Sequence, residues 1–267
     1  MVREPVVAGQ FYTADPAALR KEIQSYLSPT EPPFPAKALI APHAGYMYSG
    51  PIAGAVYSAV RPALRVIVLG PNHTGRGVPL SLCPQGGWRT PLGVVTVDQD
   101  LTERLQKECP GLQQDKAAHA REHSIEVQLP FLQVLAPGFR FSGICVGTAD
   151  YSTLETLGHA LARVIRSVDD PALLVCSSDM NHYESAEVAS HKDRMAIERI
   201  LQVDARGLYR VVLDEDISMC GFAPAVSVLT ACSDLGASSG HLIRYANSGD
   251  VSGDYERVVG YAGIAVV

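Results

Sequence analysis

The sequence predicts an α/β fold, a three-layer α/β/α sandwich around a mostly parallel or mixed sheet. Short apolar runs bounded by turn residues are typical of strands that are buried on both faces. These runs alternate along the chain with segments of helical periodicity, which is typical of a sheet covered by helices on both sides. A chain of 267 residues can bury a sizeable core, so we expect a single domain over residues 1–267.

The first half of the chain begins with a helix. Asp15-Pro16 is typical of an N-cap followed by proline at the first helical position, and Leu19, Ile23 and Leu27 then recur on one face. Residues 79–91 show neither helical nor strand periodicity and are expected to be irregular. The other elements expected here are strands over residues 38–41, 66–69 and 94–97, a helix from Ser49 through Tyr57, and a helix capped by Asp98.

The second half continues the alternation and ends in two strands. Pro130 lies inside a segment of helical pattern, so a helix over residues 124–135 is expected to kink or restart there. The remaining elements expected are strands over residues 139–146, 172–176, 241–246 and 258–267, a helix capped by Asp150, helices from beyond His182 through Leu213, and a helix over residues 222–235.

Composition and charge exclude several classes of protein. The formal net charge is -6 and lysine and arginine are scattered, so no basic field is available for a nucleic-acid backbone. No apolar stretch is long enough to span a bilayer, and the N-terminus lacks the apolar region of a signal peptide. The six cysteines are dispersed without a CxxC pair, which is typical of a reducing compartment. We expect a cytoplasmic protein that binds neither nucleic acid nor membrane.

Three of the apolar runs end in loops that carry a histidine. Residues 66–69 stop at Gly70-Pro71 and lead to His73, residues 38–41 lead to His43, and residues 173–176 lead to His182. Ligands of open α/β sheets collect outside the carboxyl ends of the strands. We therefore expect these loops to form the site, although a histidine that only hydrogen-bonds its own loop is the alternative for each.

Asp179 and His182 are expected to act together. If the chain makes a helical turn after Cys176, their i,i+3 spacing brings the carboxylate and the imidazole to one face. The acid would then orient the ring and favour one tautomer. The alternative is that Ser177, Ser178 and Asp179 cap a helix and leave His182 in solvent.

Cys220 differs from the other cysteines by its position just before a predicted helix. The helix dipole there is expected to lower the pKa of the thiol and to supply a thiolate for a metal or an electrophile. A buried and inert cysteine is the alternative, and it is the preferred interpretation for Cys176 inside an apolar strand.

A second histidine segment lies in the middle of the chain. His119 and His123 are four residues apart, but their order is not the His-Glu-x-x-His of zinc proteases, and that interpretation is rejected. Glu122 or His123 is instead expected to contact the metal ligands without binding the ion itself. Tyr46, with Tyr48, is expected to offer a hydroxyl to the same pocket. The remaining histidines are interpreted as surface or packing residues: His159, His191 and His241.

Two or three imidazoles, one thiolate and one carboxylate at strand ends suit a late first-row transition metal. Calcium and magnesium prefer shells made of oxygen, so they fit this donor set less well. An incomplete protein shell would leave positions open for water, oxygen or substrate.

At these residues the sequence resembles the Memo family, the mediator-of-cell-motility-like proteins. The resemblance is carried by five blocks in the family's order, spread over nearly the whole chain: residues 41–46, 70–73, 122–126, 177–182 and 220–221. It implies an α/β/α sandwich. It also implies a likeness to the class III extradiol dioxygenases, whose non-haem iron is held by two histidines and a glutamate.

Carried over by residue, the resemblance implies that His43 and His73 match the two histidine ligands. Cys220 stands where Memo proteins place a cysteine in lieu of the glutamate, and Asp179 and His182 match the flanking pair, with His182 as acid/base. The thiolate makes Fe(II) or copper the expected metal, with zinc as a further alternative, and puts catechol ring opening in doubt. The family association also implies AMMECR1-like and radical-SAM partner proteins.

Three functions remain open from the sequence. The first is a metal-binding redox protein or oxidoreductase with His43, His73 and Cys220 as ligands and with His182 moving protons. The second is a metal-free enzyme in which Cys220 is the nucleophile, a histidine is the base and Asp179 orients it. The third is a non-catalytic module that binds an anionic peptide, such as a phosphopeptide, or a small acid in the same cleft.

Overall fold

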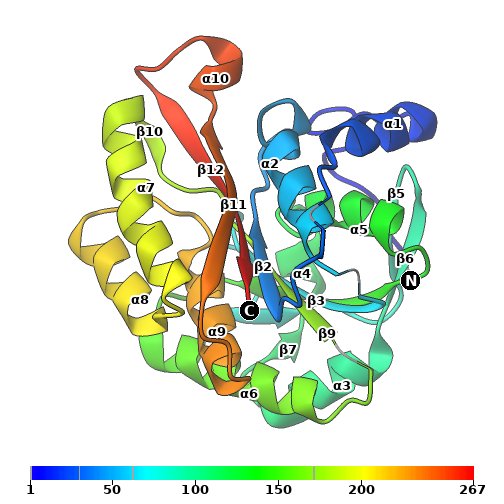
Figure 1. Ribbon diagram of the computed structural model, residues 1–267. Helices are drawn as coiled ribbons and strands as arrows, with labels where there is room; N and C mark the ends of the chain where they lie inside the picture. Colours follow the sequence, from blue (N-terminus) through cyan, green and yellow to red (C-terminus); the bar gives the residue numbers. More distant parts are fainter. Residues whose placement is uncertain (1, 30, 62, 171) are drawn as a thin grey trace.

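The computed structural model describes residues 2–29, 31–61, 63–170 and 172–267. Within them, twelve strands form one mixed sheet in the order β1-β5-β6-β8-β3-β9-β2-β12-β10, with β11 paired to β12, and β4 paired to β8 and to β7 (Figure 1). The strands are β1 (Val2–Arg3), β2 (Ala38–Ala41), β3 (Arg65–Pro71), β4 (Leu80–Leu82), β5 (Gly87–Thr90), β6 (Gly93–Val97), β7 (Gln113–Gln114), β8 (Arg140–Val146), β9 (Ala172–Ser177), β10 (His182–Glu184), β11 (Gly240–Asn247) and β12 (Val258–Val266).

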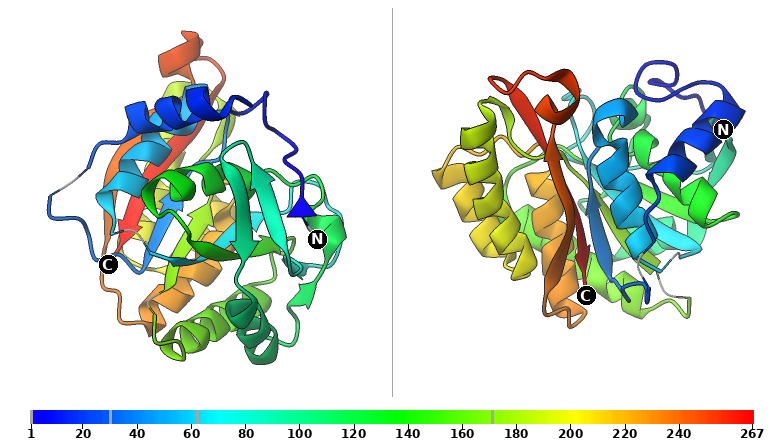
Figure 2. Two further views of the ribbon diagram at one scale, coloured as in Figure 1. Left: turned by 90° about the vertical axis from the view of Figure 1, so that its right-hand side faces the viewer. Right: turned by 45° about the horizontal axis from the view of Figure 1, so that its top comes forward.

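The helices lie on both faces of this sheet (Figure 2). They are α1 (Pro16–Tyr26), α2 (Tyr46–Ala59), α3 (Gln99–Glu108), α4 (Lys116–His119), the 3-10 helix η1 (Glu126–Gln128), α5 (Leu129–Leu135), α6 (Tyr151–Arg166), α7 (Ala186–Leu201), α8 (Ala205–Asp214), α9 (Phe222–Asp234) and α10 (Gly249–Ser252). The α/β class and the mostly parallel, mixed sheet that the sequence predicts are confirmed.

Alternation along β3 divides the core into two clusters. Val66 and Val68 pack with α1, α2 and α5 on one face, whereas Ile67 and Leu69 pack with α3, α6 and α9 on the other. Successive side chains of a strand point to opposite faces, so a fully buried strand needs apolar residues at every position. This explains why residues 66–69 of β3 form a continuous apolar run.

The order of the central strands brings three loops together. β3 pairs in parallel with β9, and β9 pairs in parallel with β2. The carboxyl ends of these three neighbours therefore lie along one edge of the sheet, and the loops that follow them carry His43, His73 and Asp179. β12 runs antiparallel to β2 on the far side.

Several predicted boundaries are wrong. α2 begins at Tyr46 instead of Ser49 and continues through Pro51, although a proline inside a helix removes one backbone hydrogen bond. The segment expected to be irregular contains β4 and β5. β10 was not expected, because three residues are too few to show a strand period.

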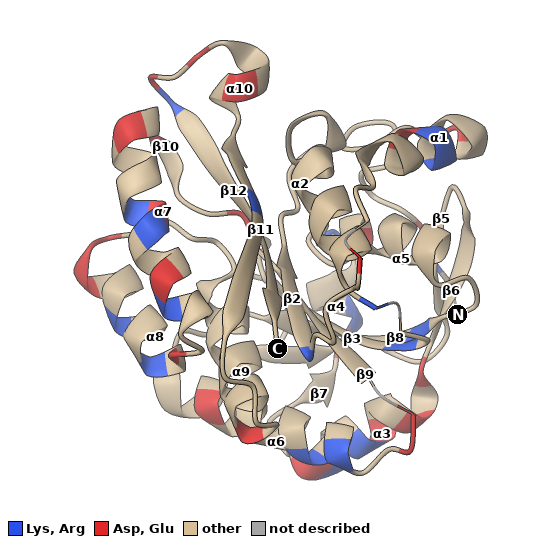
Figure 3. Ribbon diagram, in the orientation of Figure 1, with Lys and Arg blue, Asp and Glu red and all other residues tan. Residues whose placement is uncertain are grey.

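Lysine and arginine are spread over α1, α3, α6, α7 and α8 and do not gather on one element (Figure 3). Among the described helices, none combines the length and the apolarity that a membrane span requires.

Candidate metal centre

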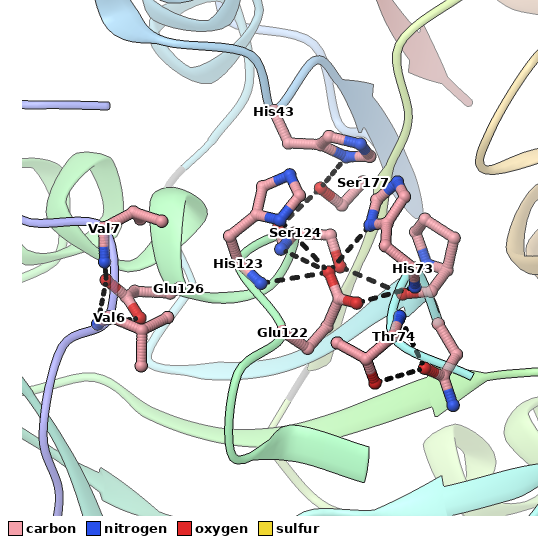
Figure 4. Close-up of polar contacts among 12 residues, drawn as sticks. Val6, Val7, His43, His73, Thr74, Glu122, His123, Ser124, Glu126 and Ser177 are labelled. Carbon is pink, nitrogen blue, oxygen red and sulfur yellow. Dashed lines mark hydrogen bonds and ion pairs between the residues drawn. The ribbon is translucent and has the colours of Figure 1, made fainter. Parts of the chain in front are cut away.

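His43, His73 and Cys220 converge in the structure. His43 follows β2, His73 follows β3, and Cys220 precedes α9, yet one ligand atom from each lies within 4.8 Å of the others. The Nε2 atom of His43 is 3.2 Å from the Sγ atom of Cys220, and the rings of His43 and His73 meet edge to face with their centroids 5.1 Å apart. Figure 4 shows the two imidazoles side by side with that of His123. The three side chains are close enough to share one ion.

A buried hydroxyl fixes the tautomer of His43. The Oγ–H group of Ser177 donates to the carbonyl oxygen of Ser124 at 2.6 Å, and Oγ accepts from Nε2 of Gln128 at 2.8 Å. Since its one proton is already used, this Oγ accepts from Nδ1–H of His43 at 2.9 Å. The proton of the imidazole is therefore on Nδ1, and Nε2 presents a lone pair toward Cys220.

Glu122 fixes His73 in the same way. Its Oε1 atom accepts from Nδ1–H of His73 at 2.9 Å, and its Oε2 atom accepts from the backbone N–H of His73 at 2.7 Å (Figure 4). Backbone N–H groups of His123 and Ser124 donate to the same carboxylate. Burial alone would raise the pKa of Glu122, but these bonds and the charge of His73 lower it to about 2. Glu122 stays ionised and leaves Nε2 of His73 free.

Electrostatics favour the neutral imidazole at His43 and His123 but the protonated imidazole at His73. Burial, together with the neighbouring His123 and His73, lowers the pKa of His43 well below its ordinary value, so this ring is neutral. Burial also lowers the pKa of His123. Burial acts in the same direction on His73, but the hydrogen bond and charge of Glu122 outweigh it and raise the pKa. Metal ligation requires the neutral form of each imidazole.

The expected low pKa of Cys220 is wrong. Burial and the charge of Asp179 raise the pKa of this thiol well above its ordinary value. The predicted helix does begin at Phe222, but its dipole does not offset the loss of water around the sulfur. A cation that binds the sulfur would favour the thiolate directly.

A glycine brings Cys220 against the β9 loop. A Cβ atom at Gly221 would meet the side chain of Ser178 and the carbonyl oxygen of Ser177. Gly221 N–H donates to Oγ of Ser178 at 3.0 Å. The absence of a side chain at position 221 therefore lets the segment before α9 approach the end of β9 and brings the sulfur toward His43.

Asp179 does not orient His182 as the sequence suggested. The chain after β9 makes no helical turn, and His182 belongs to β10. Asp179 Oδ1 instead accepts from the backbone N–H groups of His43 at 2.7 Å and Ala44 at 3.3 Å. Its carboxylate holds the loop of His43, and burial raises its pKa.

His182 is oriented by the segment that carries Cys220. Its Nδ1–H group donates to the carbonyl oxygen of Ser218 at 2.8 Å, and its backbone N–H group donates to Oγ of Ser218 at 2.7 Å. Ser218 in turn donates through its backbone N–H and its hydroxyl to Oδ1 of Asn181, both at 2.9 Å. A carbonyl oxygen accepts only, so Nε2 of His182 is the unprotonated nitrogen of the neutral ring.

A cleft of about 760 Å³ opens over these groups. Aromatic and apolar side chains from distant segments line its walls: Phe11, Met47, Tyr48, Tyr183 and Val259. His43, His73, His123, Asp179, His182 and Cys220 also line it. Tyr46 does not offer its hydroxyl to this cleft, because that hydroxyl donates to the carbonyl oxygen of Val127 at 2.6 Å within the core.

Two further groups of potential ligands overlap the first. Asp179, His182 and Cys220 form one, and His73, Glu122 and His123 form the other. In the second group, the carboxylate of Glu122 is already occupied by backbone and imidazole donors. His119 lines a separate cavity and does not reach the cleft.

Sequence reasoning predicted a supporting role for Glu122 and missed the roles of the other residues that hold the histidines. These roles depend on partners 36 to 134 residues away in the chain: Ser177, Gln128, Ser218 and Asn181. One signal was available for Gln128, which is an amide between Val127 and Leu129 in a segment of helical pattern. A buried amide requires hydrogen-bond partners.

Known proteins of one family resemble this chain over nearly its full length. A family model described as "Memo-like protein" matches residues 3–265. A MEMO1 family protein of Methanopyrus kandleri is 43% identical over 99% of this chain and 98% of its own. MEMO1 family proteins of Methanothermobacter thermautotrophicus and Pyrobaculum arsenaticum are each 42% identical, over 98% of this chain and over 99% and 98% of their own lengths.

Proposed function

Because this chain belongs to the Memo family, and because two imidazoles and a thiol meet at the base of its cleft, we propose that it is a metal-binding redox protein or oxidoreductase. His43, His73 and Cys220 would hold one Fe(II) or copper ion, with zinc as the redox-inactive alternative. When bound, iron or copper would supply electron transfer and Lewis-acid activation of a small substrate. The resemblance to class III extradiol dioxygenases motivates iron, and the thiolate makes copper equally suitable.

The donor arrangement supports this proposal. Ligand nitrogen and sulfur atoms on one tetrahedral ion lie about 3.5 Å apart, and Nε2 of His43 and Sγ of Cys220 are separated by 3.2 Å. Both ligand histidines use Nδ1 to contact a fixed acceptor, Ser177 or Glu122. Such partners orient metal ligands in proteins. The proposal rests mainly on one observation, which is that two imidazoles, each held through Nδ1, lie beside one thiol.

His182 is proposed as the residue that moves protons. Its Nδ1–H group is held by Ser218, which leaves Nε2 able to accept a proton from a molecule in the cleft. Ser218 and Asn181 act as positioning residues for this ring. Asp179 keeps the loop of His43 in place and has no direct part in the transfer.

Two observations disfavour the metal-free cysteine enzyme. The pKa of Cys220 is raised by burial, whereas a nucleophilic cysteine requires a lowered pKa. Asp179 uses Oδ1 on backbone N–H groups. Its Oδ2 atom is 4.0 Å from Nε2 of His43, which is beyond hydrogen-bond distance, so the carboxylate does not orient a histidine base as the nucleophile mechanism requires.

The lining of the cleft disfavours the binding module for an anionic peptide. Among the described residues that line it, there is no lysine or arginine, and phosphate recognition usually relies on such side chains. The aromatic and aliphatic walls suit a small molecule of low charge instead.

Metal analysis of protein purified without added metal tests the proposal. We expect the wild-type chain to retain about one ion of iron or copper and the Cys220→Ser and His73→Ala variants to lose it, because each removes one of three ligands. His182→Ala should keep the ion, which separates this ligand set from the one formed by Asp179, His182 and Cys220.

Matched controls are available in the chain. His191 is exposed, and Cys109 is buried outside the residues that line the cleft, so His191→Ala and Cys109→Ser should retain metal. Unchanged metal content in both Cys220→Ser and His73→Ala would refute the ligand assignment. Retention of zinc alone, with no uptake of Fe(II) or copper under anaerobic conditions, would refute the redox role.

A further inference from the structure

A second cavity of about 360 Å³ lies beside the N-terminal strand. It shares no lining residue with the metal cleft. β1 pairs in parallel with β5 at one side of it, where Figure 2 shows the N-terminal strand beside two short strands. His119 lines this cavity, and His123, four residues later, lines the cleft. One segment of chain therefore separates two distinct hollows.

The walls of this cavity are mostly apolar. Val6, Pro84 and Trp88 line it, and the guanidinium of Arg3 lies 4.0 Å from the centre of the indole ring. The charge of Arg3 is compensated by Glu126, whose Oε2 atom is 2.7 Å from Nη1. Three polar side chains also line the cavity, but they are exposed and their polar groups stay in water: Glu4, Gln85 and Lys116. The interior consequently favours a neutral occupant.

His119 contributes an unused hydrogen-bond acceptor. Its Nε2 atom lies 3.2 Å from the carbonyl oxygen of Ser81 and therefore carries the proton. Nδ1 is then an acceptor, and among the described residues it is the single buried side-chain polar atom without a partner. The side chain is 2% exposed and lines the cavity, so a ligand donor would reach this nitrogen through a slight shift of the imidazole. Burial lowers the pKa of His119 to about 4 and keeps the ring neutral.

We propose that this cavity binds a small, neutral, single-ring aromatic molecule that carries one O–H or N–H donor, the chemistry of a phenol. The volume is near the lower end of small-molecule pockets, about 300 Å³, and suits one ring. The indole and proline walls contact the ring, and the donor satisfies Nδ1 of His119. This site is independent of the metal ligands and of the function proposed for them.

Trp88 is the single tryptophan of the chain, so its fluorescence reports directly on this cavity. The full-length protein is titrated with phenol and with anisole, its methyl ether, which has the same ring but no donor. We expect a saturable change with both and an affinity for phenol about three- to tenfold higher, the value of one hydrogen bond. His119→Phe should bind the two probes equally, and Cys220→Ser should bind them like the wild type.

Several results would overturn this inference. Equal affinities for phenol and anisole in the wild type, a preference that persists in His119→Phe, or loss of phenol binding in Cys220→Ser would each do so. Tighter binding of benzoate than of phenol would assign the cavity to an anion instead. If His119→Phe does not fold, the ¹⁵N chemical shift of Nδ1 of His119 decides the matter on the wild type, because it should move with phenol and stay constant with anisole.

Discussion

Ser177 controls which nitrogen of His43 faces the cleft. Its single hydroxyl proton is used on the carbonyl oxygen of Ser124, and Gln128 donates to the same oxygen atom. The hydroxyl that Nδ1 of His43 meets is thus an acceptor. A hydroxyl that sits behind a ligand without touching the ion determines the coordinating atom.

Replacing Ser177 by alanine should weaken metal binding while leaving all three ligands in place. Without an acceptor for Nδ1–H, the ring of His43 is free to change tautomer or rotate, and partners of this kind typically contribute about 10- to 100-fold in affinity. Competition with a chromophoric chelator measures the loss. Ser152→Ala, at an exposed position on α6, is the matched control. Equal affinity in wild type and Ser177→Ala would show that this hydroxyl has no positioning role.

At the residue scale, the sequence allowed the prediction of side chains whose position follows from strand ends. His73 lies two residues after Pro71, the last residue of β3, so its place at the end of a strand could be predicted from the local sequence. Asn181 and Ser218 are different, because each is defined by the other across 37 residues. No local pattern specifies a contact of that separation.

At the scale of elements, the N-terminal strand is held by one side chain. Arg3 donates from Nε to the carbonyl oxygen of His119 at 2.8 Å and from Nη2 to that of Glu122 at 2.7 Å. Glu126, its ionic partner, also accepts from Tyr12 Oη–H at 2.8 Å (Figure 4 shows its bonds to the N-terminal backbone). A strand of two residues has little pairing energy of its own, so these bonds fix it to the segment that carries Glu122 and His123.

Arg3→Ala should therefore destabilise the protein by about 2–3 kcal/mol, because it leaves Glu126 buried with fewer donors. The side chain of Glu126 is 1% exposed. Arg89→Ala breaks an ion pair with Glu4 whose side chains are 48% and 66% exposed, and it should cost less than about 0.5 kcal/mol. Urea unfolding at constant m-value compares the two variants. Equal losses of unfolding free energy in the two variants would contradict the anchoring role of Arg3.

Elements with a capping residue were predicted well. Asp15, Asp98 and Asp150 each accept a backbone N–H at the start of a helix, as the sequence predicted. β1, β4 and β10 were missed since strands of two or three residues are shorter than one clear alternation. Their pairing is specified by the sheet around them, and a local pattern does not reveal it.

At the scale of the whole molecule, the site exists because β9 lies between β2 and β3. These strands begin at residues 38, 65 and 172, so their order in the sheet differs from their order in the chain. The sequence predicts parallel strands and loops at their carboxyl ends, but spatial order depends on packing of the complete chain. This is why the individual loops could be predicted and their distances could not.

A buried carboxyl group also links stability of the whole fold to pH. Asp193 on α7 is fully buried and accepts from the backbone N–H of Asn181 at 2.8 Å and from the hydroxyl of Tyr245 on β11 at 2.7 Å. Burial raises its pKa from 3.8 to about 6. It therefore joins the β10 loop, α7 and β11 through a group that prefers the protonated form.

The native state retains this proton where the unfolded chain has lost it, so the stabilisation from Asp193 is complete below about pH 4 and disappears as pH rises through about 6. Relative to Asp193→Asn, which stays neutral, the wild type should lose at most about 3 kcal/mol of unfolding free energy between about pH 4 and pH 7. Urea unfolding of both proteins across this range measures the difference and cancels the contributions of other carboxylates. Parallel stability curves would mean that Asp193 titrates alike in the folded and unfolded chains, with water or a cation compensating its burial.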